Sequence, residues 1–286
     1  MKHKIITFGE LMLRLSPDNN ERFTQAHSYE AVYGGGEANT AVSLANFNVD
    51  TRYVTKLPNH TIGQSAVNSL RQYGVDVSRI VRGGDQIGIY FLEKKTSQRP
   101  TNVIYNRNGS AFALATKEDF DWNSIFEGAT WFHFSGITPA ISDNMAEITI
   151  EACKEAKKRN ITVSCDLNYR SKLWSSEKAN KVMSEVCKYV DICIANEDDA
   201  VGIFGMDASK SDKEKNAYIA EELTKMFPNF KMVASVWRTE TSITTFKLQS
   251  MIYTDGKAYY SQEFFMNILD YIGAGDAYCA GIIYSL

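Results

Sequence analysis

The strongest chemical signal in the sequence is an acid that follows three small residues near the carboxyl end, in Gly273-Ala274-Gly275-Asp276. Small residues at a helix start leave backbone N–H groups open, and these donors together with the helix dipole bind anions. Asp276 in the first helical turn is placed to take the proton from a hydroxyl that attacks a phosphate held there. The spacing suits equally an Asp that only stabilises the start of a helix.

A second glycine-rich stretch, Gly34-Gly35-Gly36, leads into a predicted helix that contains Asn39. Glycines allow the backbone to come close to a ligand, and the Asn39 amide offers a donor and an acceptor for hydroxyl groups. Asn39 stands where a GxGxxG dinucleotide fingerprint needs its last glycine, so the stretch does not indicate dinucleotide binding. A tight turn with an Asn near the helix start explains the same residues equally well.

Two polar clusters follow predicted strands, at the edge where doubly wound α/β sheets bind their ligands. Asn168 and Arg170 follow one strand, and an Arg can pair bidentately with a carboxylate or a phosphate. Asn196 and Asp199 follow another, and acids with an Asn suit a hydrated Mg²⁺ held mostly by phosphates. Taken singly, Arg170 is more simply a surface ion pair, and the acidic cluster is a helix cap.

Several other kinds of active site are absent from the sequence. It contains no GxxxxGK[ST], GxSxG or HExxH motif, and its 4 histidines are too few for a His-rich metal site. His133 lies within a predicted buried strand and is interpreted as a core residue. The 5 cysteines are odd in number and include no CxxC pair, which predicts reduced core thiols in a cytoplasmic protein.

Composition and charge exclude further classes of protein. The 286 residues are 44% hydrophobic and 23% charged, which is typical of a globular protein and not of a disordered chain. With 31 basic and 34 acidic residues the formal charge is −3, so no net positive field favours nucleic acid or anionic lipid. No segment approaches the roughly 20 apolar residues of a membrane span. Neither nucleic acid nor a membrane is therefore an expected partner.

The elements that must position these residues alternate between short β-branched runs and segments with helical apolar spacing, the pattern of βαβ units. The predicted strands are Lys4–Phe8, Arg52–Thr55, Thr130–Phe134, Thr162–Asp166, Asp191–Ala195 and Lys231–Val236. The predicted helices are Asn39–Phe47, Gly63–Tyr73, Met145–Arg159, Ser176–Tyr189 and Asp212–Met226. We therefore expect an α/β fold with a doubly wound, mostly parallel sheet flanked by helices.

Four extended segments do not fit this alternation: Met12–Ser16, Tyr29–Tyr33, Ile87–Lys94 and Thr101–Asn106. Because no helices separate the members of each pair, we expect a small second sheet, formed from about 10–34 and 86–113. It would lie as a lid over a ligand at the carboxyl ends of the core strands. The segments carry apolar residues on both faces, and a thin sheet cannot bury both by itself. This predicts a homodimer that pairs through the lid.

Over its whole length the chain resembles the ribokinase-like (PfkB) family of carbohydrate kinases, through the two glycine-rich stretches in that order. Gly34-Gly35 through Asn39 is similar to the family's amino-terminal signature, and Gly273 through Asp276 is similar to its carboxyl-terminal one. Within the family, the stretch Asp166-Leu167-Asn168-Tyr169-Arg170 looks most like 2-keto-3-deoxygluconate kinases. The resemblance implies ATP and Mg²⁺ as cofactors and leaves open a monovalent cation.

The resemblance also implies roles for individual residues. Asp276 would be the catalytic base, and Gly273, Ala274 and Gly275 would form the anion hole. The sugar acid would contact Gly34, Gly35, Asn39, Tyr90, Tyr105, Arg107, Arg170 and Asp270, and ATP would contact Asn168, Arg170, Asn196, Ser235 and Arg238. Asp199 would hold the metal ion through water, although it is shorter than the Glu that ends the family's NxxE element.

These observations lead to the hypothesis of a single kinase domain over 1–286, which transfers the ATP γ-phosphoryl group to a hydroxyl of 2-keto-3-deoxygluconate or a close analogue. Two alternatives stay open: a kinase for another sugar or nucleoside on the same fold, and a non-catalytic sensor of sugar acids or nucleotides. The chain stops at Leu286, inside the last predicted helix. We therefore expect the carboxyl-terminal part of the family fold to be missing.

Overall fold

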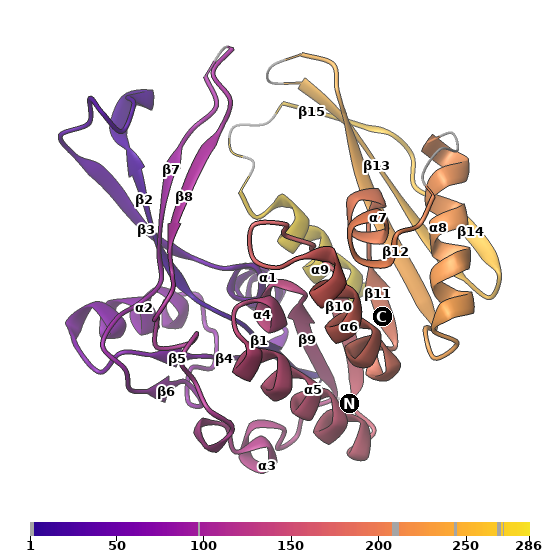
Figure 1. Cartoon of the computed structure of the whole chain (residues 1–286), viewed down its shortest axis with the longest axis horizontal. Coiled ribbons are helices and arrows are strands. Elements are labelled where there is room, and N and C mark those ends of the chain that lie inside the picture. Colours follow the sequence, from indigo (N-terminus) through magenta and orange to yellow (C-terminus); the bar gives the residue numbers. More distant parts are fainter. Residues whose placement is uncertain (1–2, 97, 208–211, 243–244, 268–269, 271) are drawn as a thin grey trace.

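The computed structural model describes residues 3–96, 98–207, 212–242, 245–267, 270 and 272–286 (Figure 1). Strands of the largest sheet are β1 (Lys4–Phe8), β4 (Asp50–Val54), β9 (Trp131–Ser135), β10 (Thr162–Asp166), β11 (Ile192–Ile194), β12 (Met232–Glu240), β13 (Thr245–Thr254), β14 (Lys257–Tyr260) and β15 (Phe264–Asn267). Their order in the described residues is β14-β13-β12-β11-β10-β9-β1-β4, with β15 paired to β13. Strands β4 to β12 in this order run parallel, which confirms the predicted mostly parallel sheet.

Helices cover both faces of the parallel part of the sheet, as a doubly wound fold requires (Figure 1). They are α1 (Gly36–Asn46), α2 (Thr61–Arg71), α3 (Trp122–Ile125), α4 (Ile137–Ala140), α5 (Asp143–Lys158), α6 (Ser176–Val186), α7 (Glu197–Phe204), α8 (Asp212–Met226) and α9 (Ala274–Ser285). Each helix expected from apolar spacing is present, with ends that differ by a few residues. The short helices α3, α4 and α7 were not predicted.

Successive residues of the central strands point to opposite faces of the sheet, and each face buries its own apolar cluster. On β1, Ile5 belongs to the cluster that includes Leu44 of α1 and Ile283 of α9. Its neighbour Ile6 belongs to the larger cluster, which also takes in α5, α6 and α8. Burial of both faces explains why these strands read as continuous hydrophobic runs.

A separate four-stranded sheet has the order β3-β2-β7-β8, with bounds β2 Met12–Pro17, β3 Tyr29–Gly34, β7 Ile89–Glu93 and β8 Asn102–Asn106. The predicted small second sheet is thereby confirmed, and we call it the lid. It stands to one side of the core, opposite the ribbon formed by β12 to β15, and α9 begins between the two (Figure 1). A third sheet pairs β5 (Lys56–Leu57) with β6 (Val81–Arg82).

The largest departure from the predicted elements lies after Val236. Strand β12 runs on to Glu240 and pairs antiparallel with β13, which in turn pairs with β14 and β15. The turn from β13 to β14 holds Asp255 at φ 50° and Gly256 at φ 72°. Asp-Gly is the dipeptide that such hairpin turns favour, so the sequence carried a signal for this ribbon that the strand and helix pattern overlooked.

The structure also bears on the buried thiols and the histidine. All five cysteines are free and buried, as the sequence predicted. His133 is buried in β9, its Nδ1 lies 2.9 Å from the Ser164 hydroxyl, and burial lowers its pKa to about 3. It is therefore a neutral core residue.

In the described part of the chain, no helix combines the length and the apolar character needed to span a bilayer.

Candidate active site

Helices α1 and α9 lie side by side, and their first turns bring the two glycine-rich stretches together. Asn39 donates from Nδ2 to Oδ2 of Asp276 at 2.7 Å, and the Thr40 hydroxyl donates to the Asp276 backbone carbonyl at 3.3 Å. A Cβ on Gly36 would lie 3.4 Å from Oδ1 of Asp276, in van der Waals contact, so this glycine borders the carboxylate. Two regions 237 residues apart in sequence thus form one site.

The start of α9 leaves space above its backbone. Gly273 precedes the helix at φ 82°, in the left-handed region that glycine adopts at little cost. No atom outside the immediate backbone lies within 4 Å of the Cβ position of Gly275. The first N–H groups of a helix have no partner within the helix, so those of this turn are available to an anion beside Asp276. Gly273, Ala274 and Gly275 as the anion hole remain a prediction.

The electrostatic surroundings of Asp276 suit a base. Burial raises the pKa of Asp276, while the hydrogen bond from Asn39 and the charge of Arg170 lower it. Among the described residues, Asn39 is the one side chain that hydrogen-bonds to this carboxylate. A carboxylate that keeps a free acceptor and has a raised pKa is better able to accept a proton near neutral pH than an ordinary surface Asp.

A cavity of about 610 Å³, called the large cavity below, opens between the lid, α1 and the start of α9. Among the predicted substrate-binding residues it is lined by Gly34, Asn39, Tyr90 and Asp270, and Gly273 also contributes to its wall. A Cβ on Gly34 would approach the Asn39 Oδ1 to 3.5 Å and the Tyr90 hydroxyl to 4.0 Å, so glycine keeps this passage open. The space continues from the neighbourhood of Asp276 to the lid.

Gly35 serves packing and not the cavity wall. A Cβ on Gly35 would overlap the carbonyl oxygen of Glu10, which lies on the chain between β1 and β2. The backbone conformation of Gly35 is extended, with φ 179°, so the requirement for glycine comes from this close approach alone. The Cβ position of Gly35 faces Glu10. Contact between Gly35 and the substrate remains a prediction.

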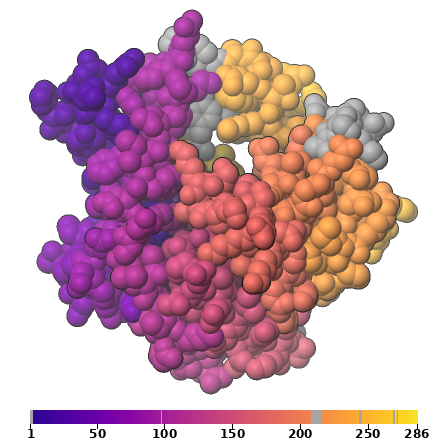
Figure 2. All heavy atoms as spheres, viewed as in Figure 1, coloured from indigo at the N-terminus to yellow at the C-terminus, as the bar shows by residue number. Residues whose placement is uncertain are grey.

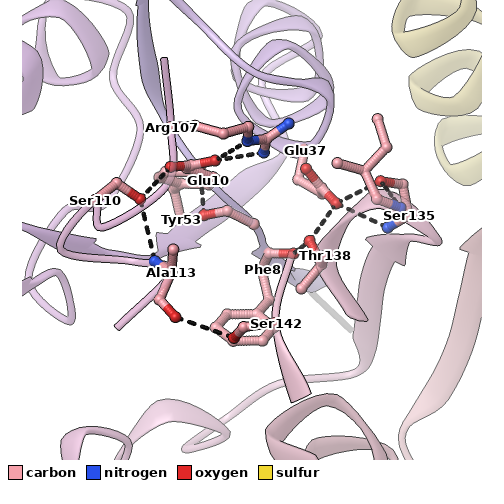
Figure 3. A network of polar contacts seen from close by, with 12 residues as sticks. Phe8, Glu10, Glu37, Tyr53, Arg107, Ser110, Ala113, Ser135, Thr138 and Ser142 are labelled. Carbon is pink, nitrogen blue, oxygen red and sulfur yellow. Dashed lines mark hydrogen bonds and ion pairs between the residues drawn. The ribbon is translucent and has the colours of Figure 1, made fainter. Parts of the chain in front are cut away.

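Tyr105 lies on β8 next to Tyr90, and Arg107 is the first residue after β8. The Tyr90 and Tyr105 rings are 5.9 Å apart, and the Arg107 guanidinium lies 5.8 Å from the Tyr105 ring centre. Arg107 is buried, donates from Nε to Glu10 at 2.8 Å and forms a second contact to the same oxygen (Figure 3). Ser110 donates to the other Glu10 oxygen at 2.5 Å. The charge of Arg107 is therefore already balanced.

On the other side of Asp276 lies a cavity of about 270 Å³, called the small cavity below. Its walls are the carboxyl ends of β10, β11 and β12 and the first turns of α9, so it sits where doubly wound sheets bind ligands. Of the predicted nucleotide-binding residues it is lined by Asn168, Arg170, Asn196 and Arg238, and the predicted metal-holding Asp199 lines it as well. The surface is hollowed between the lid and the β12 to β15 ribbon above this region (Figure 2).

Asp199 caps α7 from within. Its Oδ2 accepts from the Asn196 backbone N–H at 3.0 Å, its Oδ1 accepts from the Tyr169 backbone N–H at 2.6 Å, and the Asn196 side chain accepts from the Asp199 N–H. Burial raises the pKa of Asp199 to about 6. Burial, and then the charges of Asp199 and Asp276, also raise the pKa of Asp166. The helix cap expected as the simpler explanation is thus present.

The acids of the small cavity fit a hydrated divalent ion. Asp166 and Asp199 repel each other electrostatically, and a nearby cation would relieve that repulsion. Within the described ranges, no group of three or more His, Cys, Asp and Glu side chains is arranged to enclose a metal ion. An ion bound here would therefore keep most of its water and phosphate ligands, as Mg²⁺ prefers.

Two predicted nucleotide contacts take different positions. Ser235 is buried, its hydroxyl donates to the Ala195 carbonyl at 2.7 Å, and its own carbonyl accepts from the Tyr278 hydroxyl at 3.1 Å. It lies behind the small cavity and joins β12 to β11 and α9. Arg238 lines the cavity, and its guanidinium lies 5.8 Å from the Phe246 ring centre.

The structure adds residues that sequence patterns did not assign to the site. Arg14 of β2 lines the large cavity, and Asp166 and Tyr278 line the small one. Asp166 could have been found, because it ends a predicted strand beside Asn168 and Arg170. Arg14 belongs to a stretch, Arg14-Leu15-Ser16-Pro17, that resembles 2-keto-3-deoxygluconate kinases, but no site role was assigned to it.

These features define a class of enzyme: a doubly wound protein whose buried acid, at a helix start between two cavities, serves transfer of a phosphoryl group to a hydroxyl. A family model described as pfkB family carbohydrate kinase matches residues 2–286. The chain belongs to this family and is a carbohydrate kinase.

Three similar proteins indicate where in the family it falls. A crystal structure of 2-dehydro-3-deoxygluconokinase from Thermotoga maritima is 45% identical, with a TM-score of 0.96, and the match covers 100% of this chain and 86% of that one. A 2-dehydro-3-deoxygalactonokinase from Haloferax volcanii is 33% identical over 99% of this chain and 84% of its own length. A 5-dehydro-2-deoxygluconokinase from Clostridium perfringens is 27% identical over the whole chain.

Proposed function

We propose that the protein transfers the γ-phosphoryl group of ATP to a hydroxyl of 2-keto-3-deoxygluconate, also called 2-dehydro-3-deoxygluconate, or of a close analogue. The observation that carries the proposal is the position of Asp276, held by Asn39 between a large cavity and a small one. The large cavity takes the sugar acid, and the small cavity takes the phosphates of ATP. The names of the relatives at 45% and 33% identity support this class of substrate.

In the proposed reaction Asp276 accepts the proton of the attacking hydroxyl, because its carboxylate accepts from one described side chain, Asn39, and keeps acceptor capacity. The Asn39 amide fixes the carboxylate in place through a 2.7 Å hydrogen bond. Backbone N–H groups of Gly273 to Gly275 stabilise the charge that develops on the transferred group. Arg170, which lines the small cavity, adds a positive charge there.

We assign Mg²⁺ to the small cavity, held through water by Asp199 with Asp166 beside it. The bound ion supplies positive charge that screens the phosphates from these carboxylates. Asn168, Asn196 and Arg238 border the same space and are assigned to ATP. A monovalent cation is left as a further candidate cofactor, to be tested by titrating K⁺ and Na⁺ in the assay.

Coupled ADP release across a panel of sugar acids, neutral sugars and nucleosides tests the proposal. We expect turnover to be highest with 2-keto-3-deoxygluconate or its galactonate epimer. Faster turnover of a nucleoside or neutral sugar would favour the alternative kinase specificity. Binding of sugar acid and ATP without ADP release would favour a non-catalytic sensor. The presence of a base beside a phosphate site argues against that alternative, because a sensor does not need one.

We also propose that two copies pair through the outer face of the lid. Register places Ala31, Leu15, Phe91 and Ile104 in one apolar row across the four strands, on the face opposite Tyr90. Ile104 is 51% exposed, so the row is uncovered at its β8 end. Light scattering at micromolar concentration is expected to give the mass of a dimer, and a strict monomer would contradict the pairing.

The buried free thiols support a cytoplasmic location, where cysteines stay reduced.

We further propose that the core and lid act as a single kinase domain. Lid strands β2 and β3 lie between β1 and α1 in the chain, and β2 also pairs with β7. One cooperative transition in calorimetry, with the same midpoint by fluorescence, is the expected result, and two separate transitions would contradict it.

A further inference from the structure

Strand register places four side chains in one row across the inner face of the lid. Arg14 of β2 pairs with Val32 of β3 on one side and with Tyr90 of β7 on the other, and Tyr90 pairs with Tyr105 of β8. Residues directly opposite each other point to the same face of a sheet. Arg14, Val32 and Tyr90 all line the large cavity, so this row forms its wall on the lid side.

Arg14 differs from an ordinary surface cation in this position. Its residue is 8% exposed, and its Nε atom is buried without a hydrogen-bond partner. In the part of the chain that the structure describes, no Asp or Glu forms an ion pair with it. The guanidinium lies near the Tyr90 hydroxyl, which interacts with it electrostatically. A buried cation without a counter-charge is costly, and an anion bound in the cavity would offset that cost.

The neighbouring Arg107 shows the opposite condition. Both hydrogen bonds of its guanidinium go to Glu10, and Arg107 is absent from the residues that line the large cavity. Because Glu10 neutralises Arg107, that pair adds little net charge to the site. Asp270 lines the same cavity and acts electrostatically on the Tyr90 hydroxyl, but in the described residues it forms no ion pair with Arg14. The positive charge on the lid side of the cavity that has no ion-pair partner therefore comes from Arg14.

We propose that Arg14 is a specificity-determining residue whose guanidinium binds the carboxylate of the sugar acid. This inference deepens the proposed function and rests on it. The cavity wall runs from Asn39, which holds Asp276, past Gly34 and Tyr90 to Arg14. A linear sugar acid can lie along this wall, with the reacting hydroxyl at Asp276 and the carboxylate at the other end. A neutral sugar leaves the guanidinium unpaired and is rejected for that reason.

The test compares Arg14→Met and Arg14→Lys with wild type, on 2-keto-3-deoxygluconate and on its uncharged primary amide. We expect Arg14→Met to lower kcat/KM for the acid by roughly ten- to a hundredfold, the usual value of a charge-assisted hydrogen bond. The same change should alter kcat/KM for the amide by less than about threefold. Arg14→Lys should be intermediate, because it keeps the charge and loses the bidentate fork.

Arg22→Met is the matched control, since Arg22 is an exposed lid residue outside the large cavity. It should leave the preference for acid over amide at the wild-type value. Equal losses on acid and amide in Arg14→Met would overturn the proposal, because they would show that Arg14 only shapes the lid. An unchanged kcat/KM for the acid would overturn it as well.

Melting temperatures establish that the variants are folded. If Arg14→Met does not fold, Arg14→Lys decides the question, and an acid-to-amide ratio equal to that of wild type refutes the role of Arg14. Failure of the proposed function gives a different result, because wild-type protein would then leave 2-keto-3-deoxygluconate unphosphorylated before any variant is compared.

Discussion

Two groups of carboxylates, one buried and one half-buried, have different surroundings. In the first group, Glu37 accepts from the Ser135 backbone and hydroxyl at 2.8 and 2.7 Å and from the Thr138 hydroxyl at 2.8 Å (Figure 3). Glu10 is likewise occupied, by Arg107 and a serine. All three donors reach the same Glu37 oxygen, Oε1, while the donors to Glu10 occupy both of its oxygens. Acids held by several fixed donors join segments of the fold.

The second group faces the cavities and is less completely paired. Asp276 accepts from the side chain of Asn39, and Asp166 accepts from Asn168 at 3.3 Å and lies 3.7 Å from the Cys279 sulfur. The comparison teaches that burial alone does not mark a reactive carboxylate. A half-buried acid that accepts few hydrogen bonds has acceptor capacity left for a substrate proton or an ion.

Substitution of Asp276 should have the largest effect on activity. We expect Asp276→Asn to lower kcat by about 10²–10⁴, the usual contribution of a general base, while substrate dissociation constants change by less than about fivefold. The substitution keeps the shape of the side chain and removes its basicity. Steady-state kinetics and direct binding measure the two quantities. A loss in kcat below about tenfold would show that Asp276 only caps α9.

Breaking the Glu10–Arg107 pair should have the largest effect on stability. We expect Arg107→Met to lower the free energy of unfolding by about 3–5 kcal/mol, because Glu10 is then left as an unpaired buried charge. The double variant with Glu10→Gln should recover part of this loss. Urea denaturation measures both. If Arg107→Met unfolds like wild type but raises KM for the acid, Arg107 is free to leave Glu10 and bind substrate, as the resemblance implied.

The two groups should also respond differently to pH. Burial raises the pKa of Asp276, so kcat should fall as the pH drops through that raised value, at a higher pH than an ordinary Asp would allow. Burial likewise raises the pKa of Glu37 above 4.5, so the folded state binds its proton more tightly than the unfolded state. Stability should therefore decrease as the pH rises from 4.5 through the raised pKa.

Glu37→Gln separates these effects, because a Gln oxygen can still accept from Ser135 and Thr138. We expect this variant to lose the part of the stability change that Glu37 causes and to keep the wild-type pH profile of kcat. A shift in the pH profile of kcat in Glu37→Gln would show that Glu37 is coupled to the reaction.

The smallest expected effect concerns an ion pair between the lid side and the ribbon. Lys95, just beyond β7, contacts Glu240 at the end of β12, with 2.7 Å between Nζ and Oε1. Both side chains are partly exposed, so the pair should contribute at most about 1 kcal/mol. Glu240→Gln should change KM for either substrate by less than about fivefold, with the difference vanishing in high salt. A larger, salt-independent change would indicate that the contact controls access to the site.

The sequence allowed prediction of the parallel core because its strands are buried on both faces and its helices have clear apolar spacing. Strands β1 and β10 match their predicted bounds. The β13 to β15 ribbon escaped this reasoning, because the three apolar residues of β15 are followed by no polar alternation and all four of its residues are exposed. Tertiary pairing with β13, not local pattern, makes it a strand.

The site was predictable where a local motif carries the chemistry, as at Asn39 and Asp276. It was less predictable where function depends on a partner that is distant in sequence. Tyr105, two residues before Arg107, suggested a guanidinium beside an aromatic wall. Nothing in the local sequence indicates that Glu10, 97 residues earlier, forms an ion pair with that guanidinium. For the same reason the open position of Arg14 becomes visible only when β2, β3 and β7 are aligned.

The contact between Asn39 and Asp276 has a consequence for the synthesis of the protein. The base and the amide that holds it are 237 residues apart, so a chain emerging from the ribosome has no active site until α9 can dock on α1. The lid and the large cavity's aromatic wall are complete far earlier in the chain. An incomplete molecule therefore has no base for the reaction, and its large cavity still lacks the wall that Asp270 and Gly273 supply.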